Sequence, residues 1–180
     1  YIKLKSKKYR DLTNSFIVEG EHLVLEAYRA GLLEEIILEQ SSVFPLDLPN
    51  ERKVYVPQVI LDKISDVENP PYVMGLCRKK EESDNLGSRI LMLDGVQDPG
   101  NLGTILRSSK AFNVDTVVLS LDTVDLYNPK VIRATQGMFF HMNVVRRDLV
   151  DEINKLKSEE IPIYVTRVEY GEDIRYLKSK

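Results

Sequence analysis

Two polar side chains, Asn101 and Arg107, follow a loop rich in glycine and proline. Residues 93–115 read L-D-G-V-Q-D-P-G-N-L-G-T-I-L-R-S-S-K-A-F-N-V-D. The pattern predicts a buried strand that ends at Asp94 and a helix that follows the loop. Glycines let the backbone approach a ligand, and a helix N-terminus presents free N–H groups to an anion. The segment therefore predicts a phosphate or nucleic-acid site.

The predicted helix over residues 102–112 places Arg107 about one turn inside it, on the side that faces back to the loop. Asn101, Arg107 and the helix terminus are then expected to share one anionic group. The glycine spacing matches neither the dinucleotide-binding fingerprint nor the Walker P-loop. A tight turn with Arg107 paired to a nearby acid is the structural alternative.

The basic residues fall in two clusters on an acidic body. The 180 residues include 25 Lys+Arg and 28 Asp+Glu, a formal net charge of −3, and residues 11–77 carry twelve acidic but only four basic residues. Such clusters are typical of a protein that grips a polyanion in selected places, although short charge runs are also common on solvated surfaces. The first cluster consists of Lys3, Lys5, Lys7, Lys8 and Arg10, and the second includes Lys130, Arg133, Arg146 and Arg147.

The composition excludes several classes of protein. Hydrophobic residues make up 43% and charged residues 29%, which excludes a wholly disordered chain. The apolar runs are far shorter than the roughly 20 residues that cross a bilayer, and no signal segment is recognisable, so we expect a cytoplasmic protein. The one cysteine, Cys77, excludes an internal disulfide, and with two histidines it predicts no metal centre. A first residue other than Met indicates part of a longer protein.

Strands and helices alternate along the whole sequence. The polar stretch 78–89 predicts a linker between two domains, residues 1–77 and 90–180, with a long surface loop as the alternative. The second half predicts a mainly parallel sheet with right-handed crossovers, so the fold class is α/β. The predicted strands are 16–18, 36–38, 54–56, 73–77, 90–93, 116–119, 139–145 and 161–165. The predicted helices are 21–30, 57–64, 102–112, 128–134 and 148–158.

Three segments resemble one family. D-P-G-N-L-G-T-I-L-R, residues 98–107, is similar to the first signature of the SpoU/TrmH ribose 2′-O-methyltransferases, a branch of the knotted SPOUT superfamily. Arg10 with residues 16–27 resembles the start of the small substrate-binding domain of such enzymes, and residues 128–140 resemble the segment after the second catalytic-domain strand. The resemblance covers nearly the whole chain, and three motifs in order are more specific than one.

The resemblance implies a small α/β domain like a ribosomal protein, followed by a SPOUT α/β-knot methyltransferase domain. The implied reaction moves a methyl group from S-adenosylmethionine to a ribose 2′-hydroxyl, of ribosomal RNA rather than transfer RNA. It implies a homodimer and needs no metal. Two rival hypotheses are a non-catalytic RNA-binding or ribosome-assembly module and a small-molecule enzyme that uses the loop for a nucleotide phosphate.

The resemblance also implies roles for single residues. Arg107 would position a phosphate and stabilise a developing alkoxide, with general-base action left open, and Asn101 would orient the loop and Arg107. Lys130, Arg133 and Thr135 match positions near the RNA path. Of the remaining matched residues, Glu19 and Gly20 are expected to shape a turn, and His22 and His141 to be ordinary structural histidines.

The family's C-terminal signatures do not occur in this sequence. The donor pocket of such enzymes is a trefoil knot with a G-x-E-x-x-G signature, and the sequence ends at Lys180 before any such motif. Either a C-terminal portion is missing from the sequence, which we favour, or the protein cannot bind the donor in the usual way. Thr166 is a weak match to the end of a strand that contributes to the donor pocket.

Overall fold

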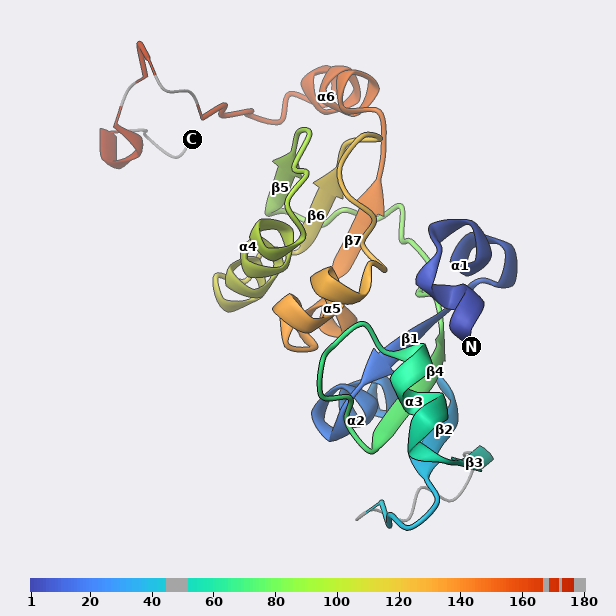
Figure 1. Ribbon diagram of the computed structural model, residues 1–180. Helices are drawn as coiled ribbons and strands as arrows, with labels where there is room; N and C mark the ends of the chain where they lie inside the picture. The colour runs from blue at the N-terminus through green and yellow to red at the C-terminus, as the bar shows by residue number, and fades with distance from the viewer. Residues whose placement is uncertain (45–51, 167–168, 172, 177–180) are drawn as a thin grey trace.

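Two sheets organise the chain in the computed structural model, which describes residues 1–44, 52–166, 169–171 and 173–176 (Figure 1). The predicted α/β class is confirmed. The four-stranded sheet has the order β1-β4-β2-β3, and the three-stranded sheet has the order β5-β6-β7. The strands are β1 (Ser15–Glu19), β2 (Leu33–Glu39), β3 (Arg52–Val56), β4 (Val73–Arg78), β5 (Ile90–Leu93), β6 (Thr116–Leu119) and β7 (Asn143–Arg146). The helices are η1 (Ile2–Lys5), α1 (Lys7–Thr13), α2 (Glu21–Arg29), α3 (Gln58–Ile64), α4 (Pro99–Ala111), α5 (Pro129–Thr135), η2 (Met138–His141), α6 (Leu149–Ser158) and η3 (Ile174–Tyr176).

The first sheet is mixed and packs against α2. Strand β4 is antiparallel to both β1 and β2, whereas β2 and β3 are parallel. Gly75 lies at the centre of β4, where a Cβ atom would come within 2.6 Å of Leu33 Cδ1 and 2.9 Å of Val18 Cγ2. The absence of a side chain at Gly75 therefore lets neighbouring side chains and Val24 of α2 close over the strand.

The second sheet is parallel and its strands follow one another in sequence order. Helices α4 and α5 connect its strands, so right-handed crossovers place both helices on one face of the sheet. The core of this face combines Leu93, Val117 and Val144 of the sheet with Leu102 and Leu106 of α4. Strand β6, at the centre, is buried along its whole length, whereas β5, at an edge, is buried only at Leu93 and half-buried at its other three residues, so the predicted burial of residues 90–93 is only partial.

One hydrophobic core joins the two sheets. The ring of Phe16, from β1, lies 4.8 Å from that of Tyr127 and 6.1 Å from that of Phe139, measured between centroids. Ile132 of α5 and Phe140 belong to the same buried cluster as the core of the first sheet. The two halves are therefore packed together rather than tethered through a single connection.

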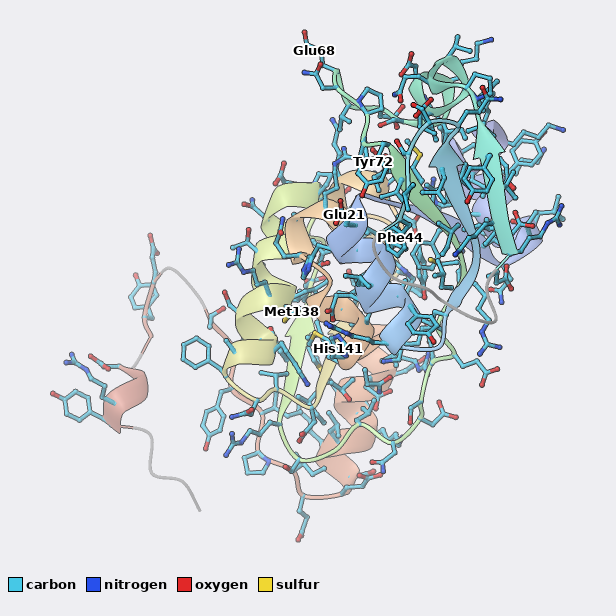
Figure 2. All side chains as sticks on the ribbon, turned by 90° about the horizontal axis from the view of Figure 1, so that it is seen from below. Glu21, Phe44, Glu68, Tyr72, Met138 and His141 are labelled. Carbon is cyan, nitrogen blue, oxygen red and sulfur yellow. The ribbon has the colours of Figure 1, made fainter. Side chains whose placement is uncertain are left out.

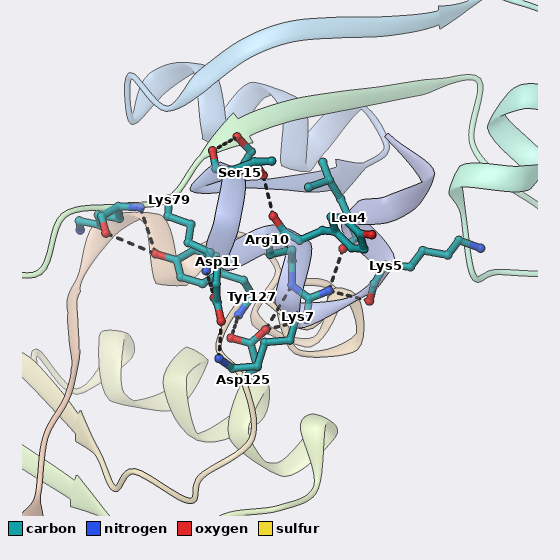
Figure 3. Close-up of polar contacts among 12 residues, drawn as sticks. Leu4, Lys5, Lys7, Arg10, Asp11, Ser15, Lys79, Asp125 and Tyr127 are labelled. Carbon is teal, nitrogen blue, oxygen red and sulfur yellow. Dashed lines mark hydrogen bonds and ion pairs between the residues drawn. The ribbon is translucent and has the colours of Figure 1, made fainter.

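Arg10 lies inside this junction (Figure 3). Its side chain is 4% exposed and its Nη2 atom donates to Asp125 Oδ2 at 2.7 Å. The Nη1 atom donates to the carbonyl oxygens of Leu4 and Lys5, at 2.8 and 2.7 Å. The guanidinium thus fixes the N-terminal helices against the loop that follows β6. It is not available to contact RNA, which corrects the expectation from the sequence.

The polar segment between the sheets, residues 79–89, has neither helix nor strand but is held along its length. Arg147 pairs with Glu82 and Asp84 at 2.5 and 2.9 Å, and Lys79 pairs with Asp11 of α1 at 2.5 Å. The side chain of Asn143 exchanges hydrogen bonds with the backbone at residue 83. The segment therefore lies along the molecule as a strap, and the predicted domain limits stay a prediction.

Two predicted strands differ in the structure. Residues 138–141 form the 3-10 turn η2 and strand β7 begins only at Asn143, because Gly137 turns the chain at a φ of 81° and directs Phe139 and Phe140 into the shared core. Residues 161–165 are extended but pair with no strand in the part of the chain that the structure describes, and Val165 is 80% exposed. An apolar sequence does not by itself provide a neighbouring strand to pair with, so the predicted strand 161–165 was wrong.

No described helix is both long and apolar enough to cross a membrane.

Candidate active site

Helix α4 begins three residues earlier than the sequence predicted. Asp98 is its N-cap, and its Oδ1 atom accepts a hydrogen bond from the Asn101 backbone N–H at 2.7 Å. Pro99 occupies the first turn, where its missing N–H costs nothing. Arg107 consequently lies more than two turns from the start of the helix instead of one.

Gly103 fixes the distance between α4 and α5. A Cβ atom at this position would come within 2.3 Å of Ala134 Cβ and 3.0 Å of the Val131 carbonyl oxygen. Because that space is already filled partly by backbone, the two helices can approach this closely only with glycine here. Gly103 thus serves helix packing rather than ligand approach.

The change Gly103→Ala tests this contact. We expect it to lower the free energy of unfolding by about 1–3 kcal/mol, because an added methyl group overpacks the helix contact. Urea unfolding followed by circular dichroism measures the change. Thr104→Ala is the matched control on the exposed side of the same turn. Equal midpoints for the two variants would contradict the packing role.

A cleft of about 400 Å³ opens where β5 ends, at the carboxyl edge of the parallel sheet. This edge is where open α/β sheets bind their ligands. Three hydrogen bonds hold the cleft's loop to the loop after β6. They run from the Gly95 N–H to Ser120 Oγ, from Gln97 Nε2 to the Asp122 carbonyl, and from the Val124 N–H to the Val96 carbonyl. The lining residues are Asp94, Gly95, Val96, Gln97, Asp98, Asn101, Thr104 and Ile105.

Arg146, at the end of β7, organises the loop after β6. Its Nη1 atom donates to the carbonyl oxygens of Ser120 and Thr123, each at 2.7 Å, and its Nη2 atom donates to that of Val124 at 2.9 Å. A single guanidinium therefore fixes a loop that borders the cleft. The sequence showed Arg146 only as part of a basic cluster, since its role depends on the neighbouring strand.

Asn101 and Arg107 lie on different sides of α4. Both are exposed, and neither side chain has a hydrogen-bond or ion-pair partner within residues 1–44 and 52–166. Six helical residues separate them by about 9 Å along the axis and about 120° around it. Since helical side chains lean toward the N-terminus, the Arg107 side chain leans toward the turn that contains Gly103, and Arg107 is not one of the residues that line the cleft. The alternative, a pairing of Arg107 with an acid, is not seen among these residues, and the sharing of one anionic group by Asn101 and Arg107 stays a prediction.

Two of the four N-terminal lysines already pair with carboxylates. Lys5 Nζ lies 2.8 Å from Asp66 Oδ1, and Lys7 Nζ lies 2.6 Å from Asp11 Oδ2. Lys3 stands over the ring of Tyr9, 5.2 Å from its centroid, and remains exposed. Lys8 is exposed and has no ion-pair or hydrogen-bond partner in the described ranges. Lys3 and Lys8 are therefore the members of this cluster that are free to meet a polyanion.

The predicted RNA-binding residues of α5 are placed differently from one another. Lys130 is exposed, whereas Arg133 Nη1 lies 3.3 Å from Glu19 Oε1 and joins α5 to β1. Thr135 is fully buried, and its hydroxyl donates to the Ile132 carbonyl at 2.7 Å and accepts from the Gly137 N–H. Thr135 therefore closes the helix and does not reach RNA, which corrects its expected role.

Both histidines lie at the junction between the sheets. His22 Nε2 lies 3.0 Å from the Gln136 carbonyl oxygen, and His141 Nε2 lies 2.5 Å from Glu26 Oε2. Figure 2 shows His141 beside α2, which supplies Glu26. The hydrogen bond from His141, and next that from Arg29, hold the pKa of Glu26 below its usual value. These contacts make the histidines structural.

Comparison with known proteins agrees with this arrangement. The family model of the SpoU rRNA methylases matches residues 88–180, and that of the MRM3-like substrate binding domain matches residues 1–75. The Bacillus subtilis 23S rRNA (guanosine(2553)-2′-O)-methyltransferase RlmP is 38% identical over 171 residues, which cover 94% of this chain and 69% of that protein.

Solved structures show the same architecture. The crystal structure of an rRNA methyltransferase from Sinorhizobium meliloti matches with a TM-score of 0.85 and 27% identity, over 98% of this chain and 71% of that one. An S-adenosylmethionine-bound rRNA methyltransferase from the same organism matches with a TM-score of 0.74 and 28% identity. That match covers 87% of this chain and 63% of the other, so the chain spans less than two thirds of the donor-bound relative. The chain belongs to the SpoU/TrmH family of S-adenosylmethionine-dependent rRNA 2′-O-methyltransferases and has an MRM3-like substrate-binding domain before its methylase domain.

Proposed function

We propose that the protein methylates the ribose 2′-hydroxyl of a guanosine in large-subunit ribosomal RNA and that Arg107 is its catalytic residue. The observation that carries this proposal is the exposed Arg107, unpaired within residues 1–44 and 52–166, on helix α4, whose first turns line a cleft at the carboxyl edge of a SpoU-type sheet. The choice of guanosine and of the large subunit rests on the 38% identity to RlmP.

Arg107 stabilises negative charge in this mechanism. The 2′-oxygen would form a bond to the methyl carbon as the carbon–sulfur bond breaks, S-adenosylhomocysteine would leave, and the hydroxyl proton would pass to solvent water. An arginine side chain stays protonated at neutral pH, so it is a poor base but a strong hydrogen-bond donor to an alkoxide or a phosphate. The side-chain amide of Asn101, in the first turn of α4, donates or accepts a hydrogen bond at the cleft and so orients the ribose. Catalysis then depends on positioning and on charge stabilisation.

The donor site is only partly provided by the described residues. S-adenosylmethionine supplies an electrophilic methyl group when bound, and its site must enclose an adenine and an amino-acid group. The cleft offers carboxylate, amide and hydroxyl groups but is open to solvent, and Thr166 is exposed in the unpaired segment after α6. The described residues therefore do not form an enclosed donor pocket.

The proposal extends to organisation and location. Residues 1–77 would select the RNA, residues 90–180 would perform the transfer, and two copies would assemble into a homodimer. Support for the dimer comes from Leu121 and Val150, which follow β6 and β7 and are 64% and 68% exposed beside the cleft's edge of the sheet. The proposed location is the cytoplasm, which holds the rRNA substrate in a bacterium such as the source of RlmP.

Site mapping tests the proposed reaction. The full-length protein is incubated with tritiated S-adenosylmethionine and a 23S rRNA transcript, and mass spectrometry of nuclease fragments locates the label. One methyl group on the ribose of a guanosine is expected, and a transcript with 2′-deoxyguanosine at that position should accept none. Label on a base, or on a ribose of another nucleotide, would overturn the proposal.

The N-terminal cluster provides a prediction about RNA binding. Because Lys3 and Lys8 have no acidic partner in the described ranges, Lys3→Gln with Lys8→Gln should reduce the slope of log K against log salt by about 1.4–1.8, or 0.7–0.9 for each phosphate that is no longer neutralised. Lys5→Gln with Lys7→Gln is the matched control, with a smaller expected change because Asp66 and Asp11 already neutralise these lysines. Filter binding at several salt concentrations measures both slopes, and equal slopes would contradict the assignment.

A further inference from the structure

A second cavity, of about 360 Å³, lies at the far end of α4 from the cleft. It opens between α4, the strap and the start of β7, close to the junction of the two sheets. Figure 2 marks the position of His141, one of its lining residues. The others are Lys80, Lys110, Asn113, Val114, Asp115, Met142 and Asn143.

Two lysine ammonium groups converge on this cavity. Lys80 Nζ donates to the carbonyl oxygens of Phe140 and Met142, at 3.2 and 2.8 Å. Lys110 Nζ donates to the carbonyl oxygen between them, that of His141, at 2.7 Å. An ammonium group has three N–H donors, so both lysines retain donors that these carbonyls do not use.

The carboxylates near the cavity are occupied elsewhere. Asp115 lines it, but its Oδ2 atom accepts from the Ser88 N–H, the Ser88 hydroxyl and the Arg89 N–H. Within the described ranges no carboxylate oxygen lies within 4.0 Å of either lysine ammonium. Burial, and then the charge of Lys110, lower the pKa of Lys80, as expected for two cations that share a site without an acid.

The cavity shares helix α4 with the residue assigned to catalysis. Lys110 follows Arg107 by three residues, which places it about 4.5 Å further along α4 and about 60° around it. Arg107 and Lys110 are therefore neighbours on the surface of α4, and Lys110 and Lys80 both line the second cavity. An RNA strand with its target ribose near Arg107 would reach the second cavity by extending along α4.

We propose that Lys80 and Lys110 form a second anion site, which binds a phosphate group at the C-terminal end of α4. The inference rests on the proposed RNA methylation, and the favoured source of the phosphate is the RNA backbone next to the target nucleotide. A free phosphate offers the same oxygens and is the other source. The site contributes to binding, whereas Arg107 contributes to the transfer itself.

Salt-dependent RNA binding by Lys110→Met tests the site. The slope of log K against log salt for a 23S rRNA fragment should fall by about 0.7–0.9. Lys110→Arg should keep the wild-type slope, and Lys157→Met, an exposed lysine of α6, is the matched control. Lys80→Met provides a second variant, and circular dichroism establishes that each protein is folded. Lys110→Met should raise the KM for RNA by a larger factor than it lowers kcat, whereas Arg107→Ala should lower kcat, which separates this site from Arg107.

Titration with inorganic phosphate separates the two sources. The readout is the urea midpoint of wild type and Lys110→Met at constant ionic strength. A reduced RNA slope in the variant supports a backbone phosphate. An unchanged slope, together with a phosphate-dependent midpoint that only the wild type shows, supports free phosphate. If the variant matches wild type in both measurements, the lysines only hold the carbonyls of residues 140–142 and the proposal is overturned.

Discussion

Arg107→Ala is expected to lower methyl transfer to rRNA by about 10²- to 10³-fold, the usual cost of removing one donor from a developing oxyanion. The side chain is exposed and makes no hydrogen bond or ion pair with residues 1–44 or 52–166, so the change disturbs no structural interaction there. The free energy of unfolding should therefore change by no more than about 0.5 kcal/mol. Single-turnover kinetics with saturating RNA and donor measures the transfer step directly.

Three comparisons make this result specific to Arg107. Lys157→Ala removes an exposed charge from α6 and should retain the wild-type rate. Arg107→Lys preserves the charge but not the planar fork of donors, so it should recover only part of the rate. RNA affinity measured without the donor should fall far less than the rate does. An Arg107→Ala protein with wild-type turnover would remove this residue from the mechanism.

Local signals in the sequence predicted the elements that contain Asn101 and Arg107. The apolar run of β5, the glycine- and proline-rich loop and the helix after it are all consecutive in the chain, so their order alone places the start of α4, with Asn101, at the sheet's carboxyl edge. The helix start was less certain, because Pro99 and the Asp98 cap extend α4 by three residues beyond the apolar periodicity. That shift moved Arg107 away from the helix terminus.

Long-range contacts account for the residues that the sequence misplaced. Arg10 reads as one more cation in a basic cluster, yet its partner, Asp125, is 115 residues away. Thr135 reads as a hydroxyl near the RNA, yet the turn at Gly137 buries it. Arg146 and Lys80 acquire their roles only because neighbouring segments present carbonyl oxygens to them. No spacing within the sequence encodes these pairings.

The strap is a further case in which the sequence does not reveal long-range contacts. Its polar composition is that of a solvated linker, so the sequence alone predicts a linker there. In the structure those polar residues are the means of attachment, because Glu82 and Asp84 both pair with Arg147 while Lys79 pairs with Asp11. The hydrogen bonds from Lys7 and Lys79 lower the pKa of the Asp11 carboxyl to about 2. Composition alone does not distinguish a free linker from a bound one.

Arg10→Met should produce the largest loss of stability, about 3–5 kcal/mol, because it leaves the carboxylate of Asp125 buried without its partner. The two side chains are only 4% and 14% exposed, so water replaces little of the broken interaction. Two carbonyl oxygens, those of Leu4 and Lys5, lose their donor in the same change. Urea unfolding measures the effect. Lys7→Met is the matched control on the same helix, and its exposed pair with Asp11 should cost less than about 1 kcal/mol.

The double variant Arg10→Met with Asp125→Leu separates the pair from its surroundings. If the cost comes from the unpaired carboxylate, removal of both charges should restore part of the stability that Arg10→Met loses. The remaining deficit would then belong to the carbonyls of Leu4 and Lys5. A double variant that is less stable than either single variant would instead show that the pair itself stabilises the junction. In both cases the position of the N-terminal sheet relative to the cleft depends on Arg10. RNA affinity should therefore fall in Arg10→Met along with the free energy of unfolding. The rate at saturating RNA should stay close to that of the wild type.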